Sequence, residues 1–167
     1  MVLLGTLVLA PVGGRMAPLG KWLHAPEHPF RDTLTAEGRR AEIVGAALLN
    51  WDEVKLPMLE VLIERRERAP IIGTDATRLW VVDREDGTRW GGLGRWVRLD
   101  ELRVGESVRI PEWDHTRRVC VSWGRVKQIR PAPGPDHLWP GTPRLCGTLR
   151  LSRGGYSFAT PGAFVHT

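Results

Sequence analysis

The chain of 167 residues has only two cysteines, one tyrosine and three lysines, and no long apolar run. Two cysteines, Cys120 and Cys146, are too few for a disulfide framework, and they indicate free thiols in a reducing compartment. A membrane-spanning helix needs about 20 apolar residues, and the short apolar start at 1–10 lacks the basic residues of a signal peptide. We therefore expect a cytoplasmic protein without membrane association.

The shortage of lysine leaves arginine to supply the other 21 of the 24 basic residues, and the net charge is +5. The arginines are spread along the chain and form no stripe interleaved with aromatic side chains, as a nucleic-acid-binding surface would. We interpret this charge as a mildly basic surface and do not expect nucleic-acid binding. No histidine or cysteine spacing resembles a zinc site, so we expect no metal, no cofactor and no small-molecule substrate.

Strand patterns dominate the rest of the sequence. Residues 58–64 alternate between apolar and polar side chains, and 119–129 reads as two strand segments separated by Gly124, with Cys120 expected in the core. Only Asp32 to Leu49 has the spacing of a helix. Many short strands with frequent turns predict an all-β fold, and the length predicts one domain over 1–167.

The end of the chain is unusually apolar, whereas chain ends are usually polar and frayed. Phe158, Phe164 and Val165 should enter the core, which would fix the position of His166. Cysteine is the best side-chain nucleophile near neutral pH, and histidine titrates near that pH. Together with Cys146 and the Thr167 hydroxyl, a fixed His166 suggests acyl transfer on the protein's own backbone.

Three segments resemble conserved parts of inteins, the self-splicing proteins with the Hint fold. Residues 5–9 followed by 11–14 match the opening strand and turn of that family. The most specific match is 95–111, which resembles the Trp-x-x-x-x-x-Leu-x-x-Gly-Asp-x-Val stretch, and the tail resembles the terminal hydrophobic–His–Asn junction. The resemblance implies a horseshoe-shaped fold whose two ends meet near the centre. It also implies a monomeric mini-intein without a homing endonuclease, whose partners are its own flanking extein segments.

Within this family the chain is most similar to class 3 inteins, which lack Cys or Ser at the first residue. Met1 occupies that place here. Class 3 inteins use an internal cysteine as the first nucleophile, which Cys146 matches, and a hydroxyl residue after the C-terminal junction, which Thr167 matches. They also carry a tryptophan in the block that 73–80 resembles, where Asp75 and Trp80 are in register.

The resemblance implies a role for each of these residues. Cys146 would form a thioester, Thr167 would accept the acyl group, and His166 would act as general acid and base at the C-terminal junction. Trp80 would keep water from the thioester, and Asp75 would hold a backbone amide or orient a neighbour.

Two departures from the family pattern predict impaired splicing. The histidine that polarises the N-terminal scissile amide would fall on Arg78, or on Thr77 in a shifted register. His166 is followed by Thr167, so either threonine replaces the cyclising asparagine or the asparagine is lost and Thr167 is the downstream nucleophile. Both cases predict an inactivated or arrested precursor.

Two other functions are compatible with the sequence. A non-enzymatic basic β-barrel could bind a partner such as nucleic acid, using exposed tryptophans and one arginine-rich face. A hydrolase with a Cys–His pair would act on an external substrate and would need an open cleft over Cys146. The geometry of the chain ends discriminates, because only the Hint fold requires both ends at its centre.

Overall fold

The fold is all-β, and the part of the chain that the structure describes adds one short 3-10 helix, η1 (Leu19–Leu23). The computed structural model describes residues 1–3, 6–23, 29–50, 57–82, 94–132, 145–152, 155 and 157–167. The strands are β1 (Val2–Leu3), β2 (Leu7–Leu9), β3 (Met16–Pro18), β4 (Asp32–Leu34), β5 (Arg40–Asn50), β6 (Met58–Ile63), β7 (Ile71–Thr74), β8 (Arg78–Val81), β9 (Arg95–Arg98), β10 (Ser107–Trp113), β11 (Val119–Pro131), β12 (Leu145–Leu151), β13 (Ser157–Ala159) and β14 (Phe164–His166). The predicted all-β class is confirmed.

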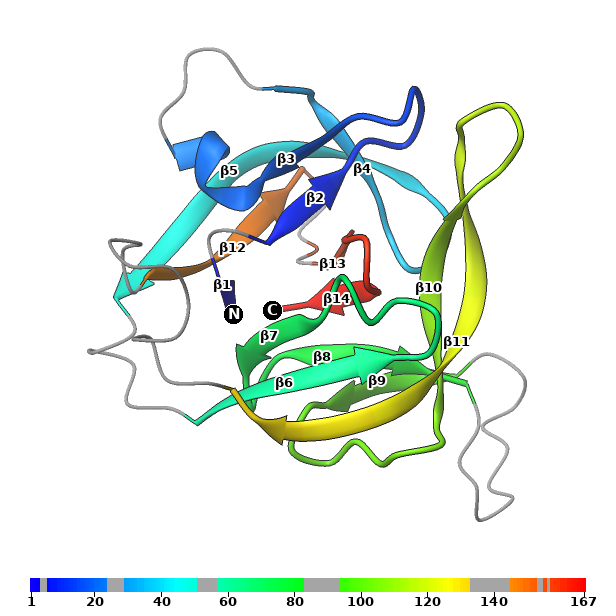
Figure 1. Ribbon diagram of the computed structural model, residues 1–167. Coiled ribbons are helices and arrows are strands. Elements are labelled where there is room, and N and C mark those ends of the chain that lie inside the picture. The colour runs from blue at the N-terminus through cyan, green and yellow to red at the C-terminus, as the bar shows by residue number, and fades with distance from the viewer. Residues whose placement is uncertain are drawn as a thin grey trace.

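Most strands belong to one sheet that curls back on itself (Figure 1). The strand order is β13-β14-β8-β10-β11-β6-β7-β1-β12-β5-β4, with β9 added beside β8, while β2 and β3 form a separate two-stranded sheet. The long strands β10 and β11 bend around one side of the molecule, and β5 and β12 lie opposite β6 and β11 (Figure 1). The two ends of the chain lie beside each other inside this curl, as the predicted horseshoe requires.

The segment from Asp32 to Leu49 is not a helix, and that prediction was wrong. It forms β4 and the long strand β5, and β5 pairs antiparallel with β4 and β12. Ala41 and Ile43 are buried while Glu42 between them is exposed, which is the two-residue period of a strand. The alanines at 46 and 47 favour a helix intrinsically, but pairing with a strand about 100 residues later in the chain overrides this weak preference.

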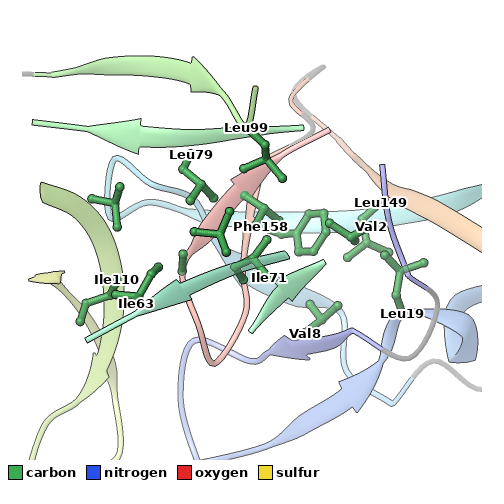
Figure 2. Packing of buried hydrophobic residues seen from close by; sticks show 14 of the residues in the cluster. Val2, Val8, Leu19, Ile63, Ile71, Leu79, Leu99, Ile110, Leu149 and Phe158 are labelled. Carbon is green, nitrogen blue, oxygen red and sulfur yellow. The ribbon is translucent and has the colours of Figure 1, made fainter. Parts of the chain in front are cut away.

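The interior of the curl is filled by one apolar cluster (Figure 2). Phe158 from β13, Leu79 from β8, Ile71 from β7 and Leu149 from β12 are all fully or almost fully buried. Burying a side chain of this size contributes roughly 1.5–3 kcal/mol relative to leaving it exposed. Strands from the start, middle and end of the sequence therefore depend on the same core.

A second, smaller cluster packs around the last strand. It is formed by Leu9, Leu34, Ala36, Val119, Ala159 and Phe164, with Trp80, Trp96 and Val121 packed against it. Phe164 and Val165 are completely buried, so the prediction that apolar residues draw the tail into the core is confirmed. Because β14 pairs with β13 on one side and β8 on the other, its backbone is held along both edges.

No helix in the described ranges is long and apolar enough to cross a membrane.

Candidate functional site

The start of the chain lies between two strands at the centre of the sheet. Val2 is paired with Gly73 of β7 and with Gly147 of β12, and Leu3 is paired with Cys146. This register places Met1 next to the turn that follows β7. The pairing of Leu3 with Cys146 brings the predicted nucleophile to within two residues of Met1 along β1.

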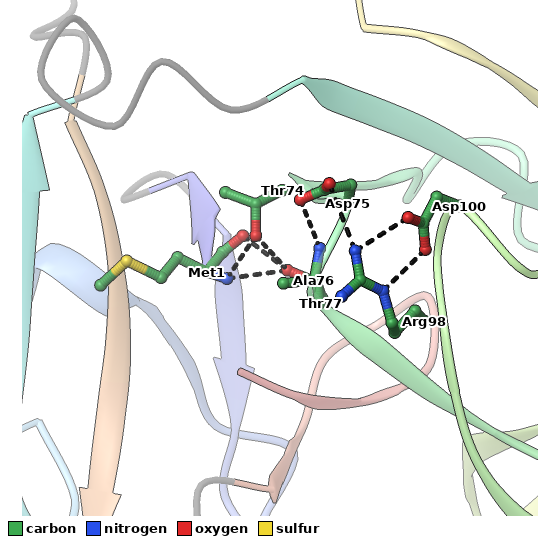
Figure 3. Close-up of polar contacts among 7 residues, drawn as sticks. All are labelled: Met1, Thr74, Asp75, Ala76, Thr77, Arg98 and Asp100. Carbon is green, nitrogen blue, oxygen red and sulfur yellow. Dashed lines mark hydrogen bonds and ion pairs between the residues drawn. The ribbon is translucent and has the colours of Figure 1, made fainter.

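Two threonine side chains hold the backbone of Met1 (Figure 3). The Met1 amino group donates to Thr74 Oγ1 at 3.0 Å and to Thr77 Oγ1 at 2.8 Å. The Met1 carbonyl accepts from the Thr77 hydroxyl and from the Thr74 backbone amide, each at 2.8 Å. Thr77 is fully buried, so water does not compete strongly for these bonds.

The polar group at Met1 is therefore supplied by Thr77 and not by Arg78. Thr77 precedes β8 and points toward Met1, whereas the Arg78 side chain is exposed. Of the two registers that the sequence allowed for the missing histidine, the geometry favours the one on Thr77. Arg78 is instead the register partner of His166 on β14, so its charge acts on the C-terminal side of the site.

Asp75 forms part of the turn that carries the two threonines. Its carboxylate accepts from the Ala76 amide at 2.7 Å and from Arg98 at 3.3 Å, and Arg98 also pairs with Asp100 at 2.8 Å (Figure 3). The Asp75 amide donates to Pro57 O, and its carbonyl accepts from the Leu99 amide. These contacts fix the turn, and none of them is to Met1.

Cys146 is fully buried in β12 beside β1. Burial raises the pKa of its thiol, because the charged thiolate loses hydration, and the positive Met1 amino group partly opposes this. The register of β1 and β12, in which Leu3 faces Cys146, places the two groups on neighbouring strands. Cys120 is exposed, contrary to the prediction of a core position, and its thiol donates to Glu112 O at 3.4 Å.

His166 lies against Trp96 at the end of β14. The two ring centroids are 5.2 Å apart and the ring planes are tilted by 57°. Burial lowers the pKa of His166, with Arg78 and the Met1 amino group adding to this and Glu37 opposing it. Trp96 in turn contacts Trp80 edge to face, with ring centroids 5.1 Å apart.

The Thr167 hydroxyl is hydrogen-bonded to the hydroxyl of Thr148. Thr148 follows Cys146 by two residues in β12, and side chains two residues apart in a strand share a face. The terminal hydroxyl thus contacts the strand and the face that carry the thiol. Thr148 was not among the predicted site residues, because its position depends on the pairing of β12 with β1 and not on local sequence.

The sequence reasoning also missed Trp96 and the cradle formed by Thr74 and Thr77. The Thr-x-x-Thr spacing was visible, but only the pairing of β1 with β7 shows that both hydroxyls meet Met1. Among the residues that the structure describes, no group of three His, Cys, Asp or Glu side chains could hold a metal ion. The arrangement offers a thiol, two hydroxyl pairs and an imidazole around the two chain ends, which are the groups that acyl transfer requires.

No model of a protein family matches the chain, and no curated protein sequence matches it. Solved structures do match over nearly the whole chain. The DnaB intein from Synechocystis sp. PCC 6803 aligns with a TM-score of 0.64 at 16% identity, covering 99% of this chain and 96% of that one. The PabCDC21-1 intein aligns with a TM-score of 0.64 at 19% identity, covering 99% and 97%.

The DnaX mini-intein from Spirulina platensis aligns with a TM-score of 0.60 at 10% identity, covering 99% of this chain and 98% of that one. Identities this low establish the fold alone, and the protein has the Hint fold of inteins.

Proposed function

We propose that this protein with the Hint fold is an intein, which acts once on its own flanking segments by acyl transfer and is arrested before splicing is complete. One observation carries the proposal. The two ends of the sequence meet on the strand that carries Cys146: β1 pairs with it through Leu3, and the Thr167 hydroxyl bonds to Thr148 two residues further on. The Met1 amino group influences the pKa of both Cys146 and His166. A fold has no structural need to bring its two ends to a buried thiol, whereas splicing requires it.

The first step is attack by the Cys146 thiolate on the carbonyl carbon of the residue that precedes Met1 in the precursor. The bond from that carbon to the Met1 nitrogen breaks, the nitrogen takes up a proton, and the upstream segment becomes a thioester on Cys146. Thr74 and Thr77 hold the Met1 nitrogen and carbonyl. They therefore orient the scissile peptide toward the thiol.

The second step transfers the acyl group to the Thr167 hydroxyl. The hydroxyl oxygen attacks the thioester carbonyl, Cys146 leaves as thiolate, and the hydroxyl proton passes to a base. His166 precedes Thr167 directly, and its lowered pKa keeps the imidazole neutral and able to accept that proton near pH 7. The bond between Thr167 and Thr148 directs the hydroxyl toward the face of β12 that carries Cys146.

Two features slow the reaction in this chain. The Thr77 hydroxyl holds the scissile amide. Unlike the imidazole of a histidine at that position, a hydroxyl is a poor proton donor to the leaving nitrogen. In addition, Thr167 follows His166 directly, and a threonine side chain cannot close the imide ring that releases the downstream segment. Loss of one positioned group costs about 100- to 1000-fold in rate, so we propose a precursor that stays uncleaved for days.

The other two sequence-based candidates gain less from the geometry. A binding barrel has no reason to enclose both chain ends, and here they meet inside the curl (Figure 1). A hydrolase acting on external substrates would need access to its nucleophile, but Cys146 is fully buried.

The test is to express the chain between two reporter domains and follow the products by mass spectrometry. We expect full-length precursor without added thiol, and slow release of the upstream reporter when an excess of dithiothreitol intercepts the thioester. Cys146→Ala should abolish this release, and Cys120→Ala, which alters an exposed thiol, should not. Equal release from both variants would contradict the assignment of the nucleophile.

A further inference from the structure

A continuous row of ring and guanidinium contacts runs from the surface to His166. The Arg109 guanidinium carbon lies 5.2 Å from the ring centroid of Trp123 and 4.8 Å from that of Trp80. Trp80 contacts Trp96 at 5.1 Å, and Trp96 contacts His166 at 5.2 Å. The five side chains come from β11, β10, β8, β9 and β14, which are neighbours in the same sheet.

Arg109 is the fixed point of this row. Its guanidinium is held between two tryptophan rings and donates a hydrogen bond to Ala36 O at 2.5 Å. Burial lowers the pKa of this guanidinium, and Glu37 opposes the shift, yet arginine keeps its charge at all ordinary pH values. A partly desolvated cation–π contact is worth roughly 0.5–2 kcal/mol, so Arg109 restrains Trp80 from its outer side.

Trp96 packs between the restrained Trp80 ring and the His166 imidazole, and so limits the movement of the imidazole. Trp80 and Trp96 meet at 86°, the edge-to-face geometry that aromatic pairs prefer. Trp96 is also paired with Trp80 in the register of β8 and β9, so both the backbone and the rings fix it. Its ring lies on one side of His166 and limits both the rotation of the imidazole and its contact with water.

The charged groups that act on His166 come from three other directions. Arg78 is its partner on β8, Glu37 belongs to the turn between β4 and β5, and the Met1 amino group approaches from β1. Ser157 of β13 is its register partner on the other edge of the strand. Trp96 is uncharged, so it acts on the imidazole by excluding water and restricting its orientation.

We propose that Trp96, held in place through Trp80 by Arg109, is a positioning residue that keeps the His166 imidazole oriented toward the C-terminal junction and shielded from water. This inference rests on the proposed function of His166 as the acid and base at that junction. A general base must point a nitrogen lone pair at the proton that it removes. A misplacement of about 1 Å can cost about 100-fold in rate, so the row of contacts affects catalysis without touching the reacting atoms.

The first test measures His166 directly in the complete chain, without any splicing. The imidazole carbon-bound protons are followed by NMR from pH 4 to 9 (a range chosen to span the histidine pKa of about 6.5), and His166→Gln identifies the signal. We expect Trp96→Leu and Arg109→Met to move the midpoint upward toward that ordinary value, because water reaches the ring. Trp96→Phe keeps an aromatic ring and should retain most of the wild-type behaviour.

Matched controls separate this effect from a general loss of stability. Trp113→Leu removes a partly exposed tryptophan from the strand that carries Arg109. Arg118→Met removes an exposed arginine from the turn between β10 and β11. Both should leave the His166 midpoint unchanged. If Trp96→Leu fails to fold, the His166 midpoints of Arg109→Met and Trp96→Phe still test the proposal. A wild-type midpoint in Arg109→Met, or the same midpoint shift in the controls, would overturn the proposal.

The second test follows cleavage at the C-terminal junction in the reporter fusion, with Asn inserted after His166 to permit it. We expect Trp96→Leu and Arg109→Met to slow this cleavage by up to about 100-fold, and to move the acid limb of the rate–pH profile upward with the midpoint. A midpoint shift without any cleavage in the parent fusion would sink the proposed function but leave the positioning role standing. Cleavage at an unchanged rate in folded Trp96→Leu and Arg109→Met would refute the positioning role alone.

Discussion

At the residue scale, the best-defined contact of the site is the cradle of hydroxyls around Met1. Thr77 makes two of its hydrogen bonds at 2.8 Å and is fully buried. We expect Thr77→Val, which keeps the shape and removes the hydroxyl, to lower the free energy of unfolding by about 1–3 kcal/mol, since the Met1 groups lose a buried partner. Urea unfolding monitored by tryptophan fluorescence measures the change.

Thr35 provides a control of the same chemistry. Its buried hydroxyl oxygen has no hydrogen-bond partner among the residues that the structure describes. Thr35→Val should therefore leave stability unchanged or raise it slightly, because an unsatisfied polar atom is removed. An equal loss in both variants would mean that the Met1 contacts contribute nothing specific.

Cys146 makes a separate prediction for alkaline pH. Its pKa is raised in the folded chain, so the folded state holds the thiol proton more tightly than the unfolded state, whose thiol has a pKa of about 8.5. The stabilisation is fully present below that pH and is lost as pH rises through the folded-state value. We expect unfolding free energies between about pH 8 and 10 to fall less steeply in Cys146→Ala than in the parent chain.

The control for this slope is Cys120→Ala, which changes an exposed side chain. Its unfolding free energy should fall with rising pH as steeply as that of the parent chain. A slope in Cys146→Ala that equals that of the parent would show that the buried thiol does not set it. The comparison uses slopes because Cys146→Ala also leaves a small cavity in β12, which lowers stability at every pH.

Single residues also show where sequence reasoning succeeds and where it stops. The apolar tail predicted the burial of Phe164 and Val165, since large apolar side chains must leave water wherever the chain allows it. Cys120 was misplaced, although Val119 beside it is buried and strand alternation then turns Cys120 outward. The partner of Met1 could not be assigned between Thr77 and Arg78, because a shift of one residue in a strand exchanges the two faces.

At the element scale, the absence of a side chain at Gly73 allows β7 to lie close to the start of β1. A Cβ at Gly73 would lie 2.7 Å from Thr77 Oγ1 and 2.9 Å from Met1 O, both well inside normal contact. We expect Gly73→Ala to destabilise the chain by about 1–3 kcal/mol, as other overpacked positions do, and to push Met1 out of its cradle. Thermal unfolding measures the first effect, and the chemical shift of the Thr74 amide, which donates to Met1 O, measures the second.

Gly45 in β5 is the matched control, because a Cβ there would meet nothing within 4 Å. Gly45→Ala restricts the unfolded chain without a clash in the strand, and should be neutral or slightly stabilising. If Gly45→Ala lowered the free energy of unfolding as much as Gly73→Ala, alanine would be unfavourable in these strands for a reason other than the close approach of β1.

The strands themselves were predictable, and their pairing was not. Residues 58–64 and 119–129 show the alternation or apolar content of strands, and they form β6 and the uninterrupted strand β11. Gly124 does not separate two strands, because it accommodates Ile63, whose Cγ2 would lie 2.7 Å from an added Cβ. Trp96 meets His166 only because β9 and β14 both pair with β8, and local sequence carries no information on such nonlocal pairing.

At the scale of the whole molecule, the curl of the sheet is what connects stability to the proposed chemistry. β1 lies between β7 and β12 in the sheet, and β14 lies between β13 and β8. The residues that would react therefore lie on or beside strands that share one sheet, and Val2 of β1 and Val165 of β14 belong to the same large apolar core. Destabilising the core at a distance should slow acyl transfer together with folding.

The last prediction restores both missing groups in one chain placed between two reporter domains. Thr77→His supplies an imidazole beside the Met1 nitrogen, where it can donate a proton to the leaving amine. Asn inserted between His166 and Thr167 supplies the amide that closes an imide ring and releases the downstream segment. We expect the doubly restored chain to yield ligated reporters and free excised protein, which mass spectrometry identifies, and each single change to yield at most one-sided cleavage.

The position of the imidazole decides between the two registers that the sequence left open. Arg78→His with the same inserted Asn places the new ring at an exposed position of β8 opposite His166, whereas the buried neighbour Thr77 is the residue that points toward Met1. This variant should give no ligation. Thr77 is buried beside Gly73, so the larger histidine must displace its neighbours, and circular dichroism has to show that the restored chain folds. A folded Thr77→His chain with the inserted Asn that releases neither reporter under reducing conditions would refute splicing as the function of this fold here.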